Sequence, residues 1–214
     1  IRNSAFRVAC AASCAATILS FAPARAVVGP ANCESLARLK VDRGEIMAAQ
    51  ANPAGEYMVM GFTGAKKVPL PAFCSVKVRL RPTADSDIKV EVWMPTAGWN
   101  GRLQAVGNGG RAGSISEDAM AGALWAGYAT AGTDTGHTGT PVMGSWALGH
   151  PEKIIDFGWR AVHLMTVGAK ALIVAYYGAP AKYAYWNGCS EGGGQALREA
   201  QRFPDDYEGI LARK

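Results

Sequence analysis

The 214-residue sequence predicts an α/β fold: a mostly parallel sheet flanked by helices, with antiparallel strands at its N-terminal side. Two observations predict this class. Residues 73–81 and 88–94 alternate apolar and polar side chains, which is typical of half-buried strands, and residues 82–87 form the expected hairpin loop between them. After Trp93, short apolar strands alternate with helical patterns, and glycines stand at the crossings, as in the βαβ units of a parallel sheet.

The remaining elements follow from the same patterns. We expect a short helix, or a helix and a turn, within 32–50 and a turn within 51–55. Beyond the hairpin, the patterns predict alternating strands and helices: strands at 102–106, 128–131 and 182–186, and helices at 117–125, 151–177 and 194–203.

The first 26 residues have the features of an export signal. Arg2 and Arg7 give a basic start, residues 8–22 are an apolar run of small side chains, and residues 24–26 fit a small-x-small cleavage site. The alternative is a buried or transmembrane helix, but the run is short and alanine-rich for a membrane span. We therefore expect a signal peptide over 1–26, one domain over 27–214, and a secreted or periplasmic protein that does not stay in the membrane.

The charge and the cysteines of the chain narrow the class of protein further. The signal carries three arginines and no acidic residue, so its removal lowers the net charge from +5 to +2, and no block of like charges remains to support nucleic-acid binding. Of the remaining cysteines Cys33, Cys74 and Cys189, one must lack a partner within the chain, since disulfides persist in an oxidising compartment and three is an odd number. Their spacing does not match a zinc site.

One motif carries chemistry. Residues 188–192 (GCSEG) fit G-x-S-x-G, in which a serine occupies a strained turn between a strand and a helix. Gly188 and Gly192 suit the turn because the strand and the helix crowd it, and Ser190 becomes the candidate nucleophile. The strand before the motif and the helix after it, closed by Pro204, strengthen this interpretation. The alternatives are a glycine-rich turn that contains a serine by chance and a phosphate-binding loop, which would end in Gly-Lys-Ser/Thr.

Acyl transfer also needs hydrogen-bond donors for the oxyanion. In this arrangement one donor is the backbone N–H of the residue after the nucleophile, here Glu191. The glycine-rich segment 107–110 is the candidate for the second donor, with Gly110 as first choice and Gly109 as second, because glycine lets the backbone approach a substrate oxygen closely. The alternative for this segment is a tight turn without a catalytic role.

Other residues have two interpretations each. His137 follows a strand at the end of the sheet where ligands bind, but we expect a structural role in its loop. His163, on the long helix, is expected to be a packed or surface residue. Trp125, Trp146 and Trp159 either line an aromatic acyl pocket or are ordinary core residues.

Together, eight stretches carry a family resemblance. They are 99–102 (WNGR), 106–110 (VGNGG), 133–137 (TDTGH), 156–157 (DF), 160–163 (RAVH), 176–178 (YYG), 188–193 (GCSEGG) and 199–210 (EAQRFPDDYEGI). In this order they resemble the tannase and feruloyl esterase family, which includes mono(2-hydroxyethyl) terephthalate hydrolase. The resemblance extends over about 33–210, and the stretches together are far more specific than G-x-S-x-G.

The resemblance implies an α/β-hydrolase core, Ser190 as nucleophile, and a small-molecule substrate that is an ester of an aromatic acid of the galloyl or feruloyl type. It implies a disulfide between Cys33 and Cys74, and a second one from Cys189 to a cysteine beside the catalytic histidine. Family members continue into a lid domain, often with a structural calcium, and then carry the catalytic Asp and His. No other cofactor is expected.

The sequence departs from the family pattern after the turn at 188–192, the nucleophile elbow. In this fold the order is Ser, then Asp or Glu, then His, yet His137, His150 and His163 all precede Ser190. Asp205 and Asp206 follow Ser190 too soon to orient a histidine, and we expect them to terminate the helix. The expectation is an N-terminal part of a catalytic domain, truncated after the elbow helix and inactive alone. The alternatives are a degenerate fragment that at most binds a ligand, and an acyltransferase on the same scaffold.

Overall fold

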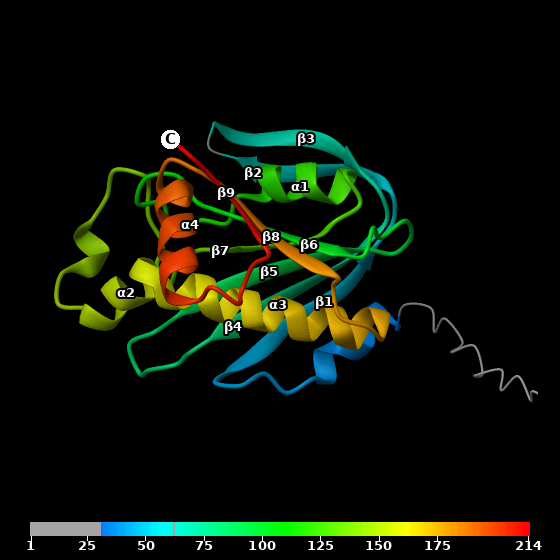
Figure 1. The fold of residues 1–214 in the computed structure, drawn as a ribbon, viewed down its shortest axis with the longest axis horizontal. Coiled ribbons are helices and arrows are strands. Elements are labelled where there is room, and N and C mark those ends of the chain that lie inside the picture. The colour runs from blue at the N-terminus through cyan, green and yellow to red at the C-terminus, as the bar shows by residue number, and fades with distance from the viewer. Residues whose placement is uncertain (1–30, 62) are drawn as a thin grey trace, which may run out of the picture.

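A computed structural model describes residues 31–61 and 63–214, so the expected signal peptide at 1–26 lies outside the described residues. A seven-stranded sheet runs through the molecule in the order β1-β4-β5-β7-β6-β8-β9, and β2 and β3 form a separate hairpin (Figure 1). None of the helices in the described ranges is long and apolar enough to cross a membrane.

The sheet is antiparallel on one side and parallel on the other. Its bounds are β1 Gly44–Asn52, β4 Phe73–Leu80, β5 Ile88–Pro95, β6 Arg102–Val106, β7 Ala129–Thr133, β8 Tyr183–Cys189 and β9 Gly209–Arg213. β1, β4, β5 and β7 pair antiparallel in that order, whereas β7, β6, β8 and β9 pair parallel. Thus β4, β7, β6, β8 and β9 point one way, and only β1 and β5 oppose them. The α/β-hydrolase fold class is confirmed.

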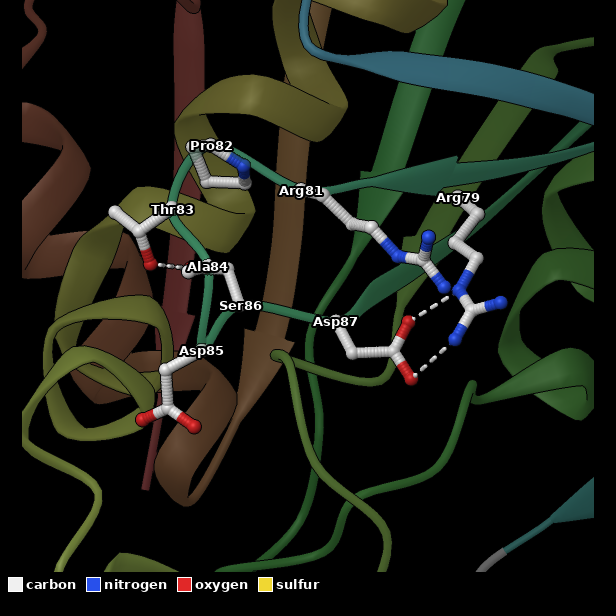
Figure 2. A pocket seen from close by; sticks show the side chains of 8 residues that line it. All are labelled: Arg79, Arg81, Pro82, Thr83, Ala84, Asp85, Ser86 and Asp87. Atoms are coloured by element: carbon white, nitrogen blue, oxygen red, sulfur yellow. Dashed lines mark hydrogen bonds and ion pairs between the residues drawn. The ribbon is translucent and has the colours of Figure 1, made fainter.

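The expected hairpin at 82–87 connects β4 and β5 in full register, from Leu80 opposite Ile88 to Phe73 opposite Pro95. Its loop surrounds a shallow cavity (Figure 2). Arg79 closes one side with a bidentate ion pair to Asp87, in which Nε and Nη2 lie 2.6 and 3.1 Å from the carboxylate oxygens.

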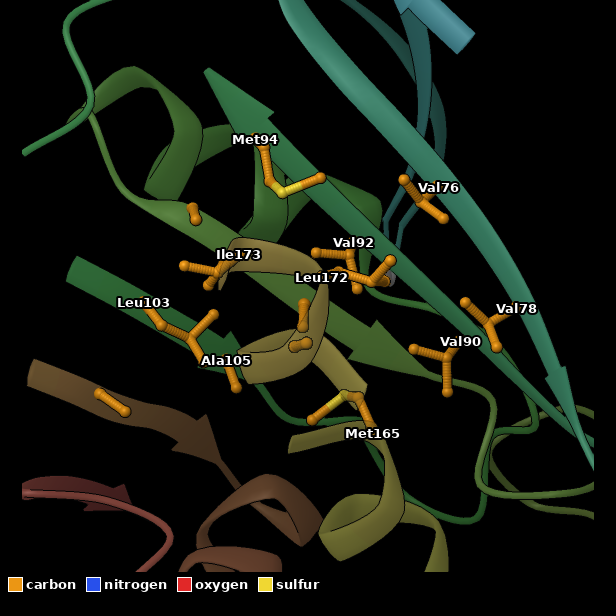
Figure 3. Packing of buried hydrophobic residues seen from close by; sticks show 14 of the residues in the cluster. Val76, Val78, Val90, Val92, Met94, Leu103, Ala105, Met165, Leu172 and Ile173 are labelled. Atoms are coloured by element: carbon orange, nitrogen blue, oxygen red, sulfur yellow. The ribbon is translucent and has the colours of Figure 1, made fainter. Parts of the chain in front are cut away.

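Helices cover both faces of the sheet. The larger core lies under α3 (Ala161–Tyr177) and α4 (Glu191–Arg202), where Met165, Leu172 and Ile173 of α3 meet valines of β4 and β5 (Figure 3). The second core lies under α1 (Glu117–Trp125) and the hairpin of β2 (Gly55–Gly61) and β3 (Gly64–Leu70). Neighbouring strand residues serve opposite cores, as Val92 and Trp93 do, because side chains alternate across a strand.

The expected helix within 32–50 is present only over its first residues. Only η1 (Cys33–Arg38) is helical, and the rest enters β1 along the edge of the sheet. β1 buries so little of its side chains that it has no period-two pattern, and pairing with β4 overrides the weak helical spacing. The expected turn at 51–55 shrinks to the residues between β1 and β2. The expected disulfide is present, and joins Cys33 of η1 to Cys74 of β4.

Later elements also differ from the expectation, some in their presence and some in their extent. β2, β3 and β9 were not expected, because each has a mostly exposed pattern that hides its strand period. The helix expected at 151–177 is interrupted, since α2 (Pro151–Ile155) passes into α3 through one π-helical turn, η3 (Asp156–Arg160). The elbow helix begins at Glu191 rather than at residue 194 and ends before Pro204. A short η2 (Ser145–Ala147) lies in the loop before α2.

Candidate active site

Ser190 occupies the turn between β8 and α4 with a backbone that serine rarely adopts, at φ 57° and ψ −119°. Such a conformation costs about 1–3 kcal/mol and persists only where its surroundings enforce it. Here β9 enforces it, since the Ser190 N–H donates to the Arg213 carbonyl oxygen at 2.9 Å. The Ser190 carbonyl in turn accepts from Gly193 and Gly194 at 3.0 and 3.2 Å, which starts α4 directly behind the serine.

The glycines on both sides of Ser190 lie in crowded backbone. A Cβ on Gly188 would lie 2.2 Å from the carbonyl oxygen of Gly192, where no atom fits. A Cβ on Gly192 would lie 3.1 Å from the Cα of Gly107, in the segment after β6. The turn, the start of α4 and the 107–110 segment are therefore packed backbone against backbone.

Hydrogen bonds hold the 107–110 segment to α4. Gly192 N–H donates to the Asn108 carbonyl at 2.9 Å. The Asn108 N–H donates to Oε1 of Gln195 at 3.2 Å, and Nε2 of Gln195 donates back to Oδ1 of Asn108 at 3.1 Å. Both side chains are buried. Gln195 was not predicted as a site residue, and the only signal for it in the sequence is a polar residue on the face of a helix that packs inward.

The backbone donors proposed for the oxyanion are available. Within the described ranges, the N–H groups of Glu191, Gly109 and Gly110 donate to no protein acceptor. Glu191 is the first residue of α4, so its N–H belongs to the unpaired first turn that favours negative charge. Gly110 has φ 59° and faces Pro141 so closely that a Cβ would lie 2.7 Å from the Pro141 carbonyl oxygen, which explains the glycine there.

Ser190 and the 107–110 segment line one cavity of about 970 Å³. It opens at the carboxyl ends of β6 and β8, whose following helices α1 and α4 cover opposite faces of the sheet. Such a switch point is where ligands bind in open α/β sheets, and the volume suits a small organic ligand. The β2–β3 hairpin contributes Met60 and Gly61 to the wall of this cavity. The cavity in Figure 2 lies in the β4–β5 loop and does not include Ser190.

Two carboxyl groups in the wall of this cavity have raised pKa values. Burial raises the pKa of Asp134 to about 6, although its Oδ1 accepts from the N–H groups of Lys89 and Gly136, both at 2.9 Å. Its Oδ2 has no hydrogen-bond donor among the described residues and lies 3.7 Å from Nζ of Lys89. Burial also raises the pKa of Glu117, which accepts from the Met60 N–H at 2.7 Å.

No histidine of the chain contacts Ser190. His137 is buried, and burial lowers its pKa. Its Nε2 lies 2.9 Å from the Arg111 carbonyl oxygen, so its ring holds the surrounding loop. His150 pairs with Asp85 at 2.8 Å, and His163 pairs with Asp206 at 2.7 Å. Cys189 is exposed and has no partner among the described residues. Asp206 is buried and contacts α3, so its role exceeds that of a helix terminator.

The three tryptophans fit neither expectation. None lines the Ser190 cavity, and none is buried, so they are neither pocket walls here nor core residues. Trp125 donates to the Pro69 carbonyl at 2.6 Å from an exposed position on α1. Trp146 stacks on His137 with ring centroids 3.9 Å apart, and the Arg202 guanidinium lies 4.5 Å from the ring centre of Trp159. The ring faces of Trp146 and Trp159 cover polar neighbours instead.

Comparison with known proteins gives a consistent assignment. A family model described as tannase and feruloyl esterase matches residues 74–214. An uncharacterized esterase of Xanthomonas campestris is 42% identical over 85% of this chain and 31% of its own length. A probable feruloyl esterase B-1 of Aspergillus fumigatus is 38% identical over 72% of this chain and 29% of its own.

Solved structures agree. The crystal structure of feruloyl esterase B from Aspergillus oryzae is similar with a TM-score of 0.76 at 33% identity, covering 84% of this chain and 36% of that one. Tannin acyl hydrolase from Aspergillus niger, at 23% identity and a TM-score of 0.60, shares the fold. This chain thus spans about a third of the length of these relatives.

Proposed function

Because this chain belongs to the tannase and feruloyl esterase family, we propose that it forms part of a carboxylic ester hydrolase with Ser190 as nucleophile. The observation that carries the proposal is the strained backbone of Ser190, held at the start of α4 beside backbone N–H groups that have no acceptor among the described residues. Strain of this kind collects at catalytic positions because an unstrained turn would not hold the hydroxyl clear of the sheet.

The reaction follows from these groups. Ser190 Oγ attacks the ester carbonyl carbon, and its proton passes to a histidine. The carbonyl oxygen becomes an oxyanion that the N–H groups of Glu191 and of Gly110 or Gly109 stabilise. The imidazolium then protonates the departing alcohol oxygen. The C–O bond to the alcohol breaks, and the acyl group stays bound to Ser190. Water hydrolyses the acyl-serine with the same histidine as base, and no metal takes part in these steps.

The histidine in this proposal lies outside the 214 residues, because His137, His150 and His163 are engaged elsewhere. A disulfide from Cys189, which is exposed beside the nucleophile, would tie that histidine's segment to the elbow. The coding sequence beyond the Lys214 codon provides the first check. We expect an Asp and a cysteine-flanked His there, and a stop codon in that place would contradict the proposal.

The substrate proposed is an ester of an aromatic acid. The cavity beside Ser190 has room for such a group, and Met60 offers a polarisable contact of the kind that aromatic rings favour. Several relatives carry the name feruloyl esterase, and this supports the same class. Methyl ferulate and methyl gallate are the substrates to compare, and acyl transfer to an added alcohol would separate a transferase from a hydrolase.

Ser190→Ala in the longer protein tests the mechanism. We expect kcat for methyl ferulate to fall by about 10⁴-fold or more, since the nucleophile acts as a unit with its base. Ser114→Ala is the matched control, because Ser114 lines the same cavity without being on the elbow. Equal, small losses in both variants would exclude Ser190 as nucleophile.

The 214-residue chain should hydrolyse esters only at background level, because it has no histidine within reach of Ser190. Purified chain and its Ser190→Ala variant would be compared on methyl ferulate. Turnover by the chain that Ser190→Ala abolishes would show that the base lies within these residues.

A further inference from the structure

Three side chains that bind metals in other proteins meet where the C-terminal half of α4 packs on α3. They are His163 on α3, Glu199 on α4 and Asp206 in the loop after α4. Nδ1 of His163 lies 2.7 Å from a carboxylate oxygen of Asp206. One ligand atom from each of the three residues lies within 4.8 Å of the other two.

Glu199 is the unexplained member of this cluster. Its side chain is fully buried, and neither carboxylate oxygen has a hydrogen-bond donor among the described residues. A buried, unpartnered carboxyl group is expensive and calls for a compensating proton, water or ion. Burial and the neighbouring Asp206 raise the pKa of Glu199, and the charges of Arg198 and Arg202 offset this only in part.

The nearby cationic and hydroxyl groups have other partners, although Nε of Arg198 is itself unpaired among the described residues. Arg198 pairs with Glu191 at the other end of α4, and Arg202 lies over the ring of Trp159. The Tyr207 hydroxyl hydrogen-bonds to Thr166. None of these groups donates a hydrogen bond to Glu199 within the described ranges, so the protein itself leaves both oxygens free to take an external cation.

We propose that His163, Glu199 and Asp206 bind a first-row divalent metal ion, for which zinc is the natural probe. One imidazole nitrogen and two carboxylate oxygens form a ligand set typical of zinc and its neighbours, whereas calcium and magnesium prefer oxygen alone. Bonds of about 2.0–2.2 Å would place ligand atoms about 3–4 Å apart, so small side-chain rotations suffice. Two carboxylates also balance the charge of a dication.

This site is separate from the candidate active site. Glu199 follows Ser190 by nine positions, which corresponds to about 13 Å along a helix. A metal here would join α3, α4 and the following loop, and so would stabilise the segment that ends in β9 without touching substrate. The alternative is a proton shared between Glu199 and Asp206, which would satisfy the pair without a metal.

The test uses the full 214-residue chain after treatment with a chelator. We expect equilibrium dialysis to give one zinc ion per chain and a rise in Tm on zinc addition. Glu199→Gln, which keeps the shape of the side chain, and His163→Ala should each lose the bound zinc and the Tm response. His150→Ala is the matched control, since His150 also pairs with an aspartate, Asp85, but on the surface and outside any three-ligand group among the described residues, and it should behave like wild type.

Cobalt identifies the ligands. Co²⁺ bound to imidazole and carboxylate gives visible bands without the intense near-ultraviolet band of a thiolate, so a thiolate band would assign the metal to a cysteine such as Cys189 and overturn the proposal. Zinc-independent melting of wild type would also overturn it, as would unchanged zinc binding in Glu199→Gln. If wild type binds no zinc and Glu199→Gln folds as stably, the shared proton is the correct account.

Discussion

The two ends of α4 build polar sites in opposite ways. At its N-terminal end, Ser190 is exposed, and the groups that matter are backbone atoms placed by strain and by glycines. At its C-terminal end, Glu199 is fully buried, and the groups that matter are side chains from three segments. A site made of backbone atoms is determined by consecutive residues, whereas a site made of side chains is assembled by tertiary packing. Substitutions at the two ends of α4 should therefore destabilise the protein for different reasons.

The largest effect is expected from Gly188→Ala, at the backbone-built end. The new Cβ would lie 2.2 Å from the Gly192 carbonyl oxygen and 2.6 Å from Nε1 of Trp186, so strand and helix must separate. We expect a loss of about 3 kcal/mol or more in the free energy of unfolding, the upper range for overpacking. Urea denaturation followed by circular dichroism measures it.

Gly168→Ala is the matched control, because Gly168 lies inside α3, where an added Cβ would meet nothing within 4 Å beyond the helix's own backbone. There the same substitution should stabilise by about 0.5–1 kcal/mol, through helix propensity. Equal effects at the two glycines would mean that the elbow is not crowded in solution.

This contrast also explains what the sequence could predict. The elbow is predictable because G-x-S-x-G, its strand and its helix are contiguous, and the β4–β5 hairpin is predictable from the alternation in its two strands. The Glu199 cluster was not predicted, because its members are separated by up to 43 positions and share no local motif. Gln195 was missed for the same reason, since its partner Asn108 lies 87 positions away. β1 and β9 were missed because edge strands bury too little to show a period.

Asp134 tests whether a buried side-chain charge is costly at the elbow end too. Its pKa is raised to about 6 by burial, so the folded protein binds this proton more tightly than an unfolded chain, whose carboxyl titrates near 4. Stability should therefore be greatest below pH 4 for this group, fall as the pH rises from about 4 to 6, and stay level above. The full difference is about 3 kcal/mol, as an upper bound.

Asp134→Asn should remove this dependence, because the amide cannot ionise and its oxygen can still accept from Lys89 and Gly136. Thermal melts of both proteins from pH 4 to 8 would show it: the two should converge at pH 4, and the variant should be the more stable at pH 8. Parallel pH profiles would exclude Asp134 as the origin.

Gln195→Met is expected to cost about 2 kcal/mol, because it leaves the N–H and Oδ1 of buried Asn108 without their partner. In the longer ester hydrolase proposed above, kcat should fall more than KM rises, since the 107–110 segment would hold its N–H groups less firmly around the oxyanion. Gln201→Met, at an exposed position of the same helix, should change stability by less than about 0.5 kcal/mol. A change in stability with unaltered kcat would restrict Gln195 to a structural role.

The smallest expected effect is a gain. Ser190→Gly removes the side chain that makes φ 57° and ψ −119° unfavourable, which relieves about 1–3 kcal/mol of strain, while the added freedom of glycine in the unfolded chain costs about 0.5–1 kcal/mol. The net should be a stabilisation of about 1 kcal/mol. Ser190→Ala also removes the hydroxyl but keeps a Cβ, so it should not gain. If both variants are stabilised equally, the hydroxyl rather than the backbone conformation destabilises the native protein. If only Ser190→Gly is stabilised, the elbow stores backbone strain that β9 and α4 sustain. The N-terminal end of α4 is then held in place at the expense of stability, as a site built from backbone would be.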